Sequence, residues 1–390
     1  MRNPKNRSRA FYRSIRFNIM NSKVLFSLLA MIVLFSAHCG RAYEFPSYNI
    51  VYSKNLNLQA AATEAVRSIP EEAHGRIQTN AIYVLSNGEA VLEAYGNGFD
   101  PKHLQPLWSI SKFLLNAVSG MAVLEGKLDL SSPVAVYLPE LESALPKTLT
   151  VKDLLYHASG GDWKEGYEWN PFKSDVLAML YGIGKDDHAA YVSTKSFRPG
   201  LSVKYSSGDS NLLSAVLASI YKREGGFPKV FFERMEVKEY VWETDSKGVP
   251  VGSSYAYLTP KDLAKIGELY IHRGLYKGKR IFSETWPRET SGPFPNETAL
   301  PFPLSYLPIP SMGGHLYSNR KRGTPEIPVF EFLSGNSIFG SGHWGQSLII
   351  DPDRKLVIVR FGNDRLGRFP MKDFAKKILL AVSESEESTP

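Results

Sequence analysis

The sequence predicts an α/β (α+β) fold in which both ends of the chain build one antiparallel sheet covered by helices. Three observations predict it. A strand-like hairpin pattern occurs towards each end of the chain, a helical pattern accompanies each hairpin, and the long segment between them has mostly helical periodicity. The 390 residues suffice for one large domain with an inserted helical subdomain.

The first 42 residues have the composition of an export signal. They hold eight Lys or Arg and no acidic residue, and residues 24–35 (VLFSLLAMIVLF) are almost wholly apolar. About twelve apolar residues fit a signal sequence, whereas a spanning helix needs roughly 20. Gly40-Arg41-Ala42 fits a cleavage site, and Cys39 is an alternative site for a lipid. We expect an exported protein, periplasmic or membrane-anchored facing outside the cytoplasm, that contacts membrane only through this leader or a lipid on Cys39.

The charge of the remaining chain argues against nucleic-acid binding. The whole chain carries +7, but eight of its 46 basic residues lie in the leader, which leaves 38 against 39 acidic residues. Basicity confined to a leader provides no surface for nucleic acid. Because the only cysteine also lies there, cysteine catalysis is excluded from the body of the chain.

After the leader, a helix and then a hairpin are predicted near the N-terminal end, and a hairpin and then a helix near the C-terminal end. Residues 55–69 have helical spacing, and the apolar runs 81–85 and 90–95 flank Ser86-Asn87-Gly88, a strong hairpin signal. Near the other end, residues 346–350 and 356–361 predict a second hairpin. A helix over 371–382 and a loose acidic tail over 383–390 follow it.

The middle of the chain differs from both ends. We predict one domain over 43–390, with a mostly helical subdomain at about 131–290 and a loop-rich segment at about 291–337. The predicted helices of the subdomain cover residues 151–156, 175–181, 210–222 and 260–274. A segment with many Pro and Gly and as long as 291–337 is often a functional rim or lid.

The pattern Ser109-Ile110-Ser111-Lys112 opens an apolar helix. Residues three apart share one helical face, so the Lys112 amine comes within reach of the Ser109 hydroxyl. A buried lysine can lose its proton near neutral pH and act as a base. The alternative is that Ser109 only caps the helix.

The same Ser-x-x-Lys spacing recurs twice. Ser219 and Lys222 fall at the end of a helix, and Ser318 and Lys321 fall in a basic stretch that we interpret as a turn. Both are expected to lie on the surface, because only Ser109 begins a helix that must be buried.

Two further motifs follow. Tyr205-Ser206-Ser207 precedes a predicted helix, so that Tyr205 can relay a proton and Ser207 can donate to substrate; the alternative is that Tyr205 is one of many packing tyrosines. Gly342-His343-Trp344-Gly345-Gln346 leads into a strand, where the Gln346 backbone N–H could join that of Ser109 in an oxyanion hole. His343 could instead be structural. The eight histidines show no metal-ligand spacing, so neither a metal nor another cofactor is expected.

These three motifs, in this order, resemble the serine β-lactamase and penicillin-recognising superfamily. The similar branch contains class C β-lactamases, esterases and 6-aminohexanoate-oligomer hydrolases. Residues 127–134, 154–161 and 252–264 also resemble landmarks of that family. The resemblance implies a β-lactamase/transpeptidase-like fold.

For the site, the resemblance implies that Ser109 is the acylated nucleophile, Lys112 its base and Tyr205 the proton relay. Ser207 becomes a substrate contact, together with His343, Trp344, Gly345 and Gln346. His343-Trp344-Gly345 stands where β-lactamases carry Lys-Thr-Gly. Because a histidine is largely neutral at pH 7, it provides no fixed charge for a substrate carboxylate, which argues against efficient β-lactam hydrolysis.

The expected function is hydrolysis of small amides or esters through an acyl-enzyme on Ser109. A β-lactamase or a cell-wall D-Ala-D-Ala peptidase is the enzymatic alternative. Two alternatives are not enzymes: a penicillin-binding sensor that is acylated without turnover, and an inactive scaffold.

Overall fold

The computed structural model describes residues 48–66, 77–168, 170–294, 297, 307–364 and 367–387. The leader, and with it the predictions on Cys39 and the cleavage site, lies outside the described residues. Within those ranges no helix is both long and apolar enough to cross a membrane.

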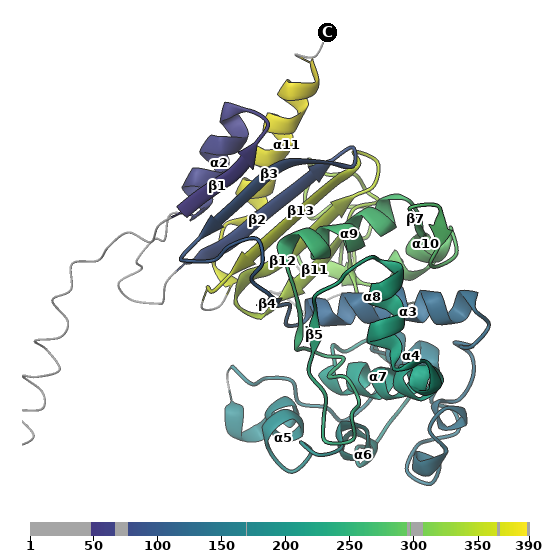
Figure 1. The fold of residues 1–390 in the computed structure, drawn as a ribbon. Coiled ribbons are helices and arrows are strands. Elements are labelled where there is room, and N and C mark those ends of the chain that lie inside the picture. The colour runs from purple at the N-terminus through teal and green to yellow at the C-terminus, as the bar shows by residue number, and fades with distance from the viewer. Residues whose placement is uncertain are drawn as a thin grey trace, which may run out of the picture. The chain divides into compact units, whose positions relative to one another are not determined.

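One eight-stranded antiparallel sheet is built from both ends of the chain (Figure 1). Its strand order is β1-β3-β2-β13-β12-β11-β10-β9, so that β2 from the N-terminal half pairs directly with β13 from the C-terminal end. This confirms the predicted fold class. The strands are β1 (Tyr48–Ser53), β2 (Thr79–Ser86), β3 (Glu89–Gly96), β9 (Pro310–Met312), β10 (Tyr317–Lys321), β11 (Ile338–Gly342), β12 (Gln346–Asp351) and β13 (Leu356–Gly362).

Both predicted hairpins are present. β2 and β3 pair on either side of Asn87 and Gly88, which have φ values of 52° and 80°. Two left-handed residues in succession are what a two-residue turn needs to match the twist of its strands, and Asn-Gly tolerates them best. β12 and β13 form the second hairpin, which begins where the Gly-rich stretch 342–345 ends.

Helices cover both faces of the sheet (Figure 1). On one face, α2 (Leu56–Val66) and α11 (Met371–Glu387) bury side chains such as Leu58 and Ile378 against β2 and β3. On the other face, α9 (Pro260–Ile271) contacts β2, β12 and β13. Because α11 continues to Glu387, the prediction that the tail is loose from Ser383 is wrong up to that residue.

The predicted helical segment contains most of the remaining elements. α3 (Ile110–Leu124), which precedes that segment in the chain, contacts α7 (Ser207–Tyr221) within it, and their buried faces belong to the larger hydrophobic cluster. The others are β4 (Gln105–Pro106), η1 (Val134–Val136), η2 (Pro139–Leu141), α4 (Val151–Leu155), η3 (Pro171–Lys173), α5 (Asp175–Tyr181), α6 (His188–Ser193), η4 (Lys222–Glu224), α8 (Phe227–Arg234), β5 (Val241–Trp242), β6 (Ala256–Leu258), β7 (Leu275–Tyr276), β8 (Lys279–Arg280) and α10 (Trp286–Ser291).

A buried ion pair fixes the loop between β11 and β12. Arg360 on β13 is fully buried and makes two hydrogen bonds to Asp364, at 2.7 and 3.0 Å. Its guanidinium also donates to the Gly345 carbonyl at 2.8 Å. A Cβ on Gly345 would lie 2.3 Å from the Asp364 carboxylate, so the pair also requires glycine at that position. The loop that carries His343 is thus attached to the sheet through Arg360.

Removing one member of this pair is expected to be costly, because the other charge stays buried without compensation. We predict that Asp364→Ala lowers the free energy of unfolding by about 3–5 kcal/mol. Lys377→Ala, which breaks the exposed Lys377–Glu64 pair, should lower it by less than about 1 kcal/mol. Urea denaturation of the two variants measures the difference, and equal losses would contradict this account of the loop.

Candidate active site

Ser109 lies at the start of the buried helix α3. Its backbone is already helical, with φ −64° and ψ −10°, and within the described helix its side chain makes no capping hydrogen bond. The residues that follow, from Ile110 to Ala122, are all buried. The interpretation of Ser109 as a simple helix cap therefore has no support in the geometry, and its hydroxyl is available for other contacts.

Lys112 lies one turn further along α3, and its amine makes three polar contacts. Nζ lies 2.8 Å from the Ser253 carbonyl oxygen, 3.2 Å from Ser207 Oγ and 3.3 Å from Ser109 Oγ. Ser253 is itself held by Asn211, which accepts from the Ser253 N–H at 3.0 Å. The amine is therefore oriented by groups from three separate segments.

Burial changes the acidity of this amine. Lys112 is 2% exposed, and burial lowers its pKa to about 8, while the carboxylate of Glu165 opposes that shift. A lysine with this pKa is partly neutral at physiological pH. It can therefore accept a proton from a neighbouring hydroxyl.

Tyr205 approaches Ser109 from the other side. Its hydroxyl donates to Ser109 Oγ at 2.7 Å, and Lys112 Nζ lies 4.7 Å from the centre of its ring. Burial raises the pKa of Tyr205 well above its usual value, so the phenol stays protonated. Of the two groups that contact Ser109, Lys112 is thus the one suited to accept a proton, and Tyr205 the one that donates a hydrogen bond.

Ser207 contacts Lys112 and also a residue that the sequence motifs did not single out. Its hydroxyl donates to Glu165 Oε1 at 2.6 Å, and its backbone N–H donates to Glu165 Oε2 at 3.0 Å. The predicted role of Ser207 as a donor to substrate conflicts with this geometry, because its one hydrogen is donated to Glu165.

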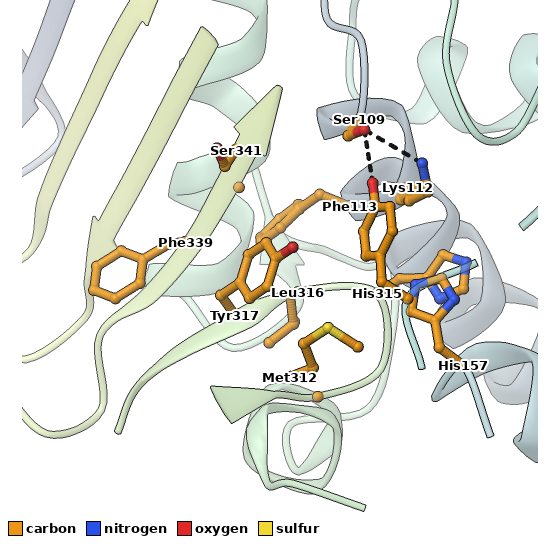
Figure 2. A pocket seen from close by; sticks show the side chains of 13 residues that line it. Ser109, Lys112, Phe113, His157, Met312, His315, Leu316, Tyr317, Phe339 and Ser341 are labelled. Atoms are coloured by element: carbon orange, nitrogen blue, oxygen red, sulfur yellow. Dashed lines mark hydrogen bonds between the residues drawn. The ribbon is translucent and has the colours of Figure 1, made fainter. Parts of the chain in front are cut away.

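The site lines a cleft between α3 and the strands β9, β10 and β11 (Figure 2). Much of its wall is apolar, with Phe113 from the helix and Phe339 from the sheet. The cleft residues are Ser109, Lys112, Phe113, His157, Tyr205, Met312, Gly313, His315, Leu316, Tyr317, Phe339, Gly340 and Ser341. An apolar cleft with a few convergent polar groups is typical of small-molecule binding sites.

The edge of β11 faces this cleft. In the described residues β10 pairs with β11 only at Ile338 and Phe339, so Gly340 and Ser341 continue beyond the end of that pairing. A Cβ on Gly340 would lie 3.4 Å from Ile110, and one on Gly342 would lie 2.4 Å from the Leu107 carbonyl. Glycines therefore allow this strand to pass close to the start of α3.

The motif at 343–346 lies beside the site. Neither His343, Trp344, Gly345 nor Gln346 is among the described residues that line the cleft. His343 contacts Trp108 edge-on, and its Nδ1 lies 3.2 Å from Glu168. Burial lowers the pKa of His343, which keeps the ring neutral. The Gln346 side chain is directed at β13, where it donates to the Gly362 carbonyl at 2.7 Å.

Two histidines, not predicted from the sequence, form the base of the cleft. The rings of His157 and His315 stack with centroids 4.2 Å apart (Figure 2). His157 also contacts the ring of Tyr205. Burial lowers the pKa of His315 to about 3 and that of His157 well below its usual value. His157 Nδ1 and His315 Nε2 have no hydrogen-bond partner among the described residues. Both rings are therefore neutral.

Five aromatic residues in or near the cleft have left-handed backbones. Trp108, His157, Tyr255, His315 and Trp344 have φ values between 48° and 65°. Two of them line the cleft, and Tyr255 and Trp344 contact the ring of Trp108. Such conformations cost about 1–3 kcal/mol each and concentrate at functional sites. Their position agrees with the choice of this cleft as the candidate site.

A model of the β-lactamase family matches residues 62–382. The chain belongs to the β-lactamase family. It is 27% identical over 311 residues to a 6-aminohexanoate-dimer hydrolase from Paenarthrobacter ureafaciens, covering 73% of this chain and 72% of that protein.

Solved structures agree with this membership of the β-lactamase family. A Bacillus anthracis protein assigned as a 6-aminohexanoate-dimer hydrolase superposes with a TM-score of 0.64 at 18% identity, over 89% of this chain and 92% of that one. A class C β-lactamase gives 0.55 at 16% identity, over 78% and 93%. At these identities the likeness concerns the fold.

The other two Ser-x-x-Lys matches in this β-lactamase-family chain do not line the cleft. Ser219 Oγ donates to the Val216 carbonyl, and Lys222 is exposed, as predicted. Ser318 is buried on strand β10, so the prediction of a surface turn there is wrong. In the described part of the chain no group of three or more His, Cys, Asp and Glu side chains could hold a metal ion.

The stacked histidines His157 and His315 should make the free energy of unfolding depend on pH below about 6.5. Both stay neutral in the folded protein, but in the unfolded chain each takes up a proton below about pH 6.5. The unfolded state then binds more protons, so each histidine lowers stability by about 1.4 kcal/mol per pH unit below that value. We predict that His315→Phe makes the fall in unfolding free energy between pH 6.5 and pH 4.5 less steep.

Exposed His272→Phe should leave the slope of that fall unchanged. Chemical denaturation at several pH values measures both variants. A His315→Phe protein that loses stability as steeply as the wild type would mean that His315 is not held neutral in the fold.

Proposed function

We propose that the protein is a serine hydrolase that cleaves small linear amides or esters through an acyl-enzyme on Ser109. The observation that carries the proposal is the contact of Ser109 Oγ with two different groups, the Lys112 amine at 3.3 Å and the Tyr205 hydroxyl at 2.7 Å. The first is a base whose pKa burial has lowered to about 8, and the second is a protonated donor.

In the proposed acylation step, the neutral Lys112 amine takes the Ser109 proton while Oγ attacks the carbonyl carbon. The carbonyl π electrons move to its oxygen, where backbone N–H groups at Ser109 and at the open edge of β11 would stabilise the charge. When the tetrahedral adduct collapses, the bond to the leaving group breaks, and that amine or alcohol takes a proton from Lys112, with Tyr205 as relay. Water then cleaves the acyl-enzyme by the same sequence of proton transfers.

The electrostatics argue against a β-lactam substrate, whose carboxylate would need a fixed positive charge. His343, which stands where a fixed lysine charge would meet a carboxylate, has a lowered pKa and is neutral. The cleft histidines are neutral as well. The relative that is 27% identical is a 6-aminohexanoate-dimer hydrolase, whose name denotes a linear amide substrate. These observations support linear amides or esters.

Lys112→Ala tests the base directly. It should slow acylation by about 10²–10⁴-fold, since that is the usual contribution of general base catalysis. The measurement is kcat/KM for p-nitrophenyl acetate, a small ester, and for the 6-aminohexanoate dimer, a linear amide. Lys222→Ala is the matched control, because it alters the lysine of the other helical Ser-x-x-Lys pair and should leave the rate unchanged.

Near-native rates of the Lys112→Ala protein would remove Lys112 from the mechanism. Turnover of a D-Ala-D-Ala peptide together with covalent trapping by a penicillin would replace this proposal by a peptidase. A stoichiometric burst without turnover on every substrate would identify a sensor.

A further inference from the structure

Glu165 carries no role in the mechanism above, yet three hydrogen bonds hold its carboxylate. Its Oε2 accepts from the Trp163 indole N–H at 2.5 Å and from the Ser207 backbone N–H at 3.0 Å, and its Oε1 accepts the Ser207 hydroxyl hydrogen. Trp163 packs against the start of α7, where a Cβ on Gly208 would lie 2.8 Å from its ring. Because Trp163 is held against α7 and donates to Glu165, it keeps the Glu165 carboxylate beside Ser207.

The number of hydrogens around Lys112 determines what this carboxylate does. A neutral amine has two N–H hydrogens and one lone pair, and Lys112 Nζ has three polar neighbours. The Ser253 carbonyl can only accept, so it takes the first hydrogen. Ser207 Oγ has donated its own hydrogen to Glu165, so towards Lys112 it can only accept and takes the second. The lone pair is left for Ser109.

We propose that Glu165 is a positioning residue that, by accepting the Ser207 hydrogen, directs the lone pair of neutral Lys112 at the Ser109 hydroxyl. This inference rests on the proposed function. Without Glu165, the Ser207 hydroxyl is free to donate to that lone pair. The amine would then present an N–H to Ser109 and could not take its proton.

Glu165 has a second effect, through its charge. The titratable groups around Lys112 are Tyr205, on the segment before α7, the histidines His157 and His315, and Glu165. Burial keeps the pKa of Tyr205 high and the pKa values of both histidines low, so all three are neutral near pH 8. The carboxylate of Glu165 holds the pKa of Lys112 higher than burial alone would.

A double-mutant cycle between Glu165 and Ser207 tests the direction of the lone pair. The readout is the plateau of kcat/KM for p-nitrophenyl acetate at high pH, where Lys112 is neutral in every variant. We expect Glu165→Ala to lower the plateau by about 10–100-fold, a part of the range for general base catalysis. In the Ser207→Ala background, Glu165→Ala should cause no further loss, because the competing hydroxyl is gone. Equal losses in both backgrounds would overturn the proposal.

The pH profile gives a readout that a merely structural role would not move. In the wild type kcat/KM should rise through about pH 8, where Lys112 loses its proton. Glu165→Gln and Glu165→Ala remove the charge that stabilises the Lys112 ammonium, so the rise of kcat/KM with pH should move to lower pH. A rise that stays at the wild-type pH, or moves to higher pH, contradicts this effect of Glu165 on Lys112. If Glu165→Ala does not fold, Glu165→Gln replaces it in the cycle: the Trp163 and Ser207 N–H groups hold its amide oxygen, so its NH2 faces the Ser207 hydroxyl and the plateau should fall as well. An unchanged plateau would overturn the proposal.

Two controls separate the possible failures. Glu140→Ala, at an exposed position on η2, should leave both the plateau and the pH of the rise unchanged. Ser109→Ala should abolish turnover. If Ser109→Ala is inactive while the Glu165 variants behave like the wild type, only the role of Glu165 fails. If Ser109→Ala keeps its activity, the proposed function itself fails.

Discussion

Burying a lysine amine away from water costs free energy unless its hydrogens find acceptors. Most contacts of the site supply such acceptors to Lys112. The Ser253 carbonyl and the Ser207 hydroxyl accept from the amine, and each is fixed by a further bond, to Asn211 and to Glu165 respectively. Burial nevertheless lowers the pKa of the amine to about 8, which suits it to accept a proton. The chemistry of the site is therefore a consequence of the burial of this one group.

The fold meets that requirement by bringing separate segments to one point. α3 supplies both Ser109 and Lys112, and α7 with the residues before it supplies Tyr205 and Ser207. The sheet contributes the edge of β11, which approaches the start of α3 closely because Gly340 and Gly342 have no side chains. Since β2 pairs with β13, the sheet that contributes this edge is built from both ends of the chain.

The periodic features of the fold were predictable from sequence, because they depend on local spacing. Asn87-Gly88 marked its hairpin through a turn geometry that few residue pairs tolerate. The spacing of Ser109 and Lys112 within one helical turn likewise indicated their contact. Ser318 was misjudged because β10 is polar at every position after Tyr317, the same composition as a basic turn, and only its pairing with β11 distinguishes them.

The contacts that the sequence did not predict join residues far apart in the chain. Glu165 meets Ser207 across 42 positions, and His157 meets His315 across a longer interval, so neither has a local pattern. The one available signal for Glu165 was a carboxylate placed among aromatic residues directly after the stretch 154–161 that resembles a family landmark. That signal does not say which hydroxyl the carboxylate binds.

The central claim is that Ser109 is an activated nucleophile within reach of substrate. The most direct measurement is the intact mass of the protein after incubation with a fluorophosphonate, which forms a stable adduct with activated serines, beside the Ser109→Ala variant. The account predicts one adduct on the wild type and none on the variant. The absence of an adduct on both proteins, or an adduct that persists on Ser109→Ala, would contradict it.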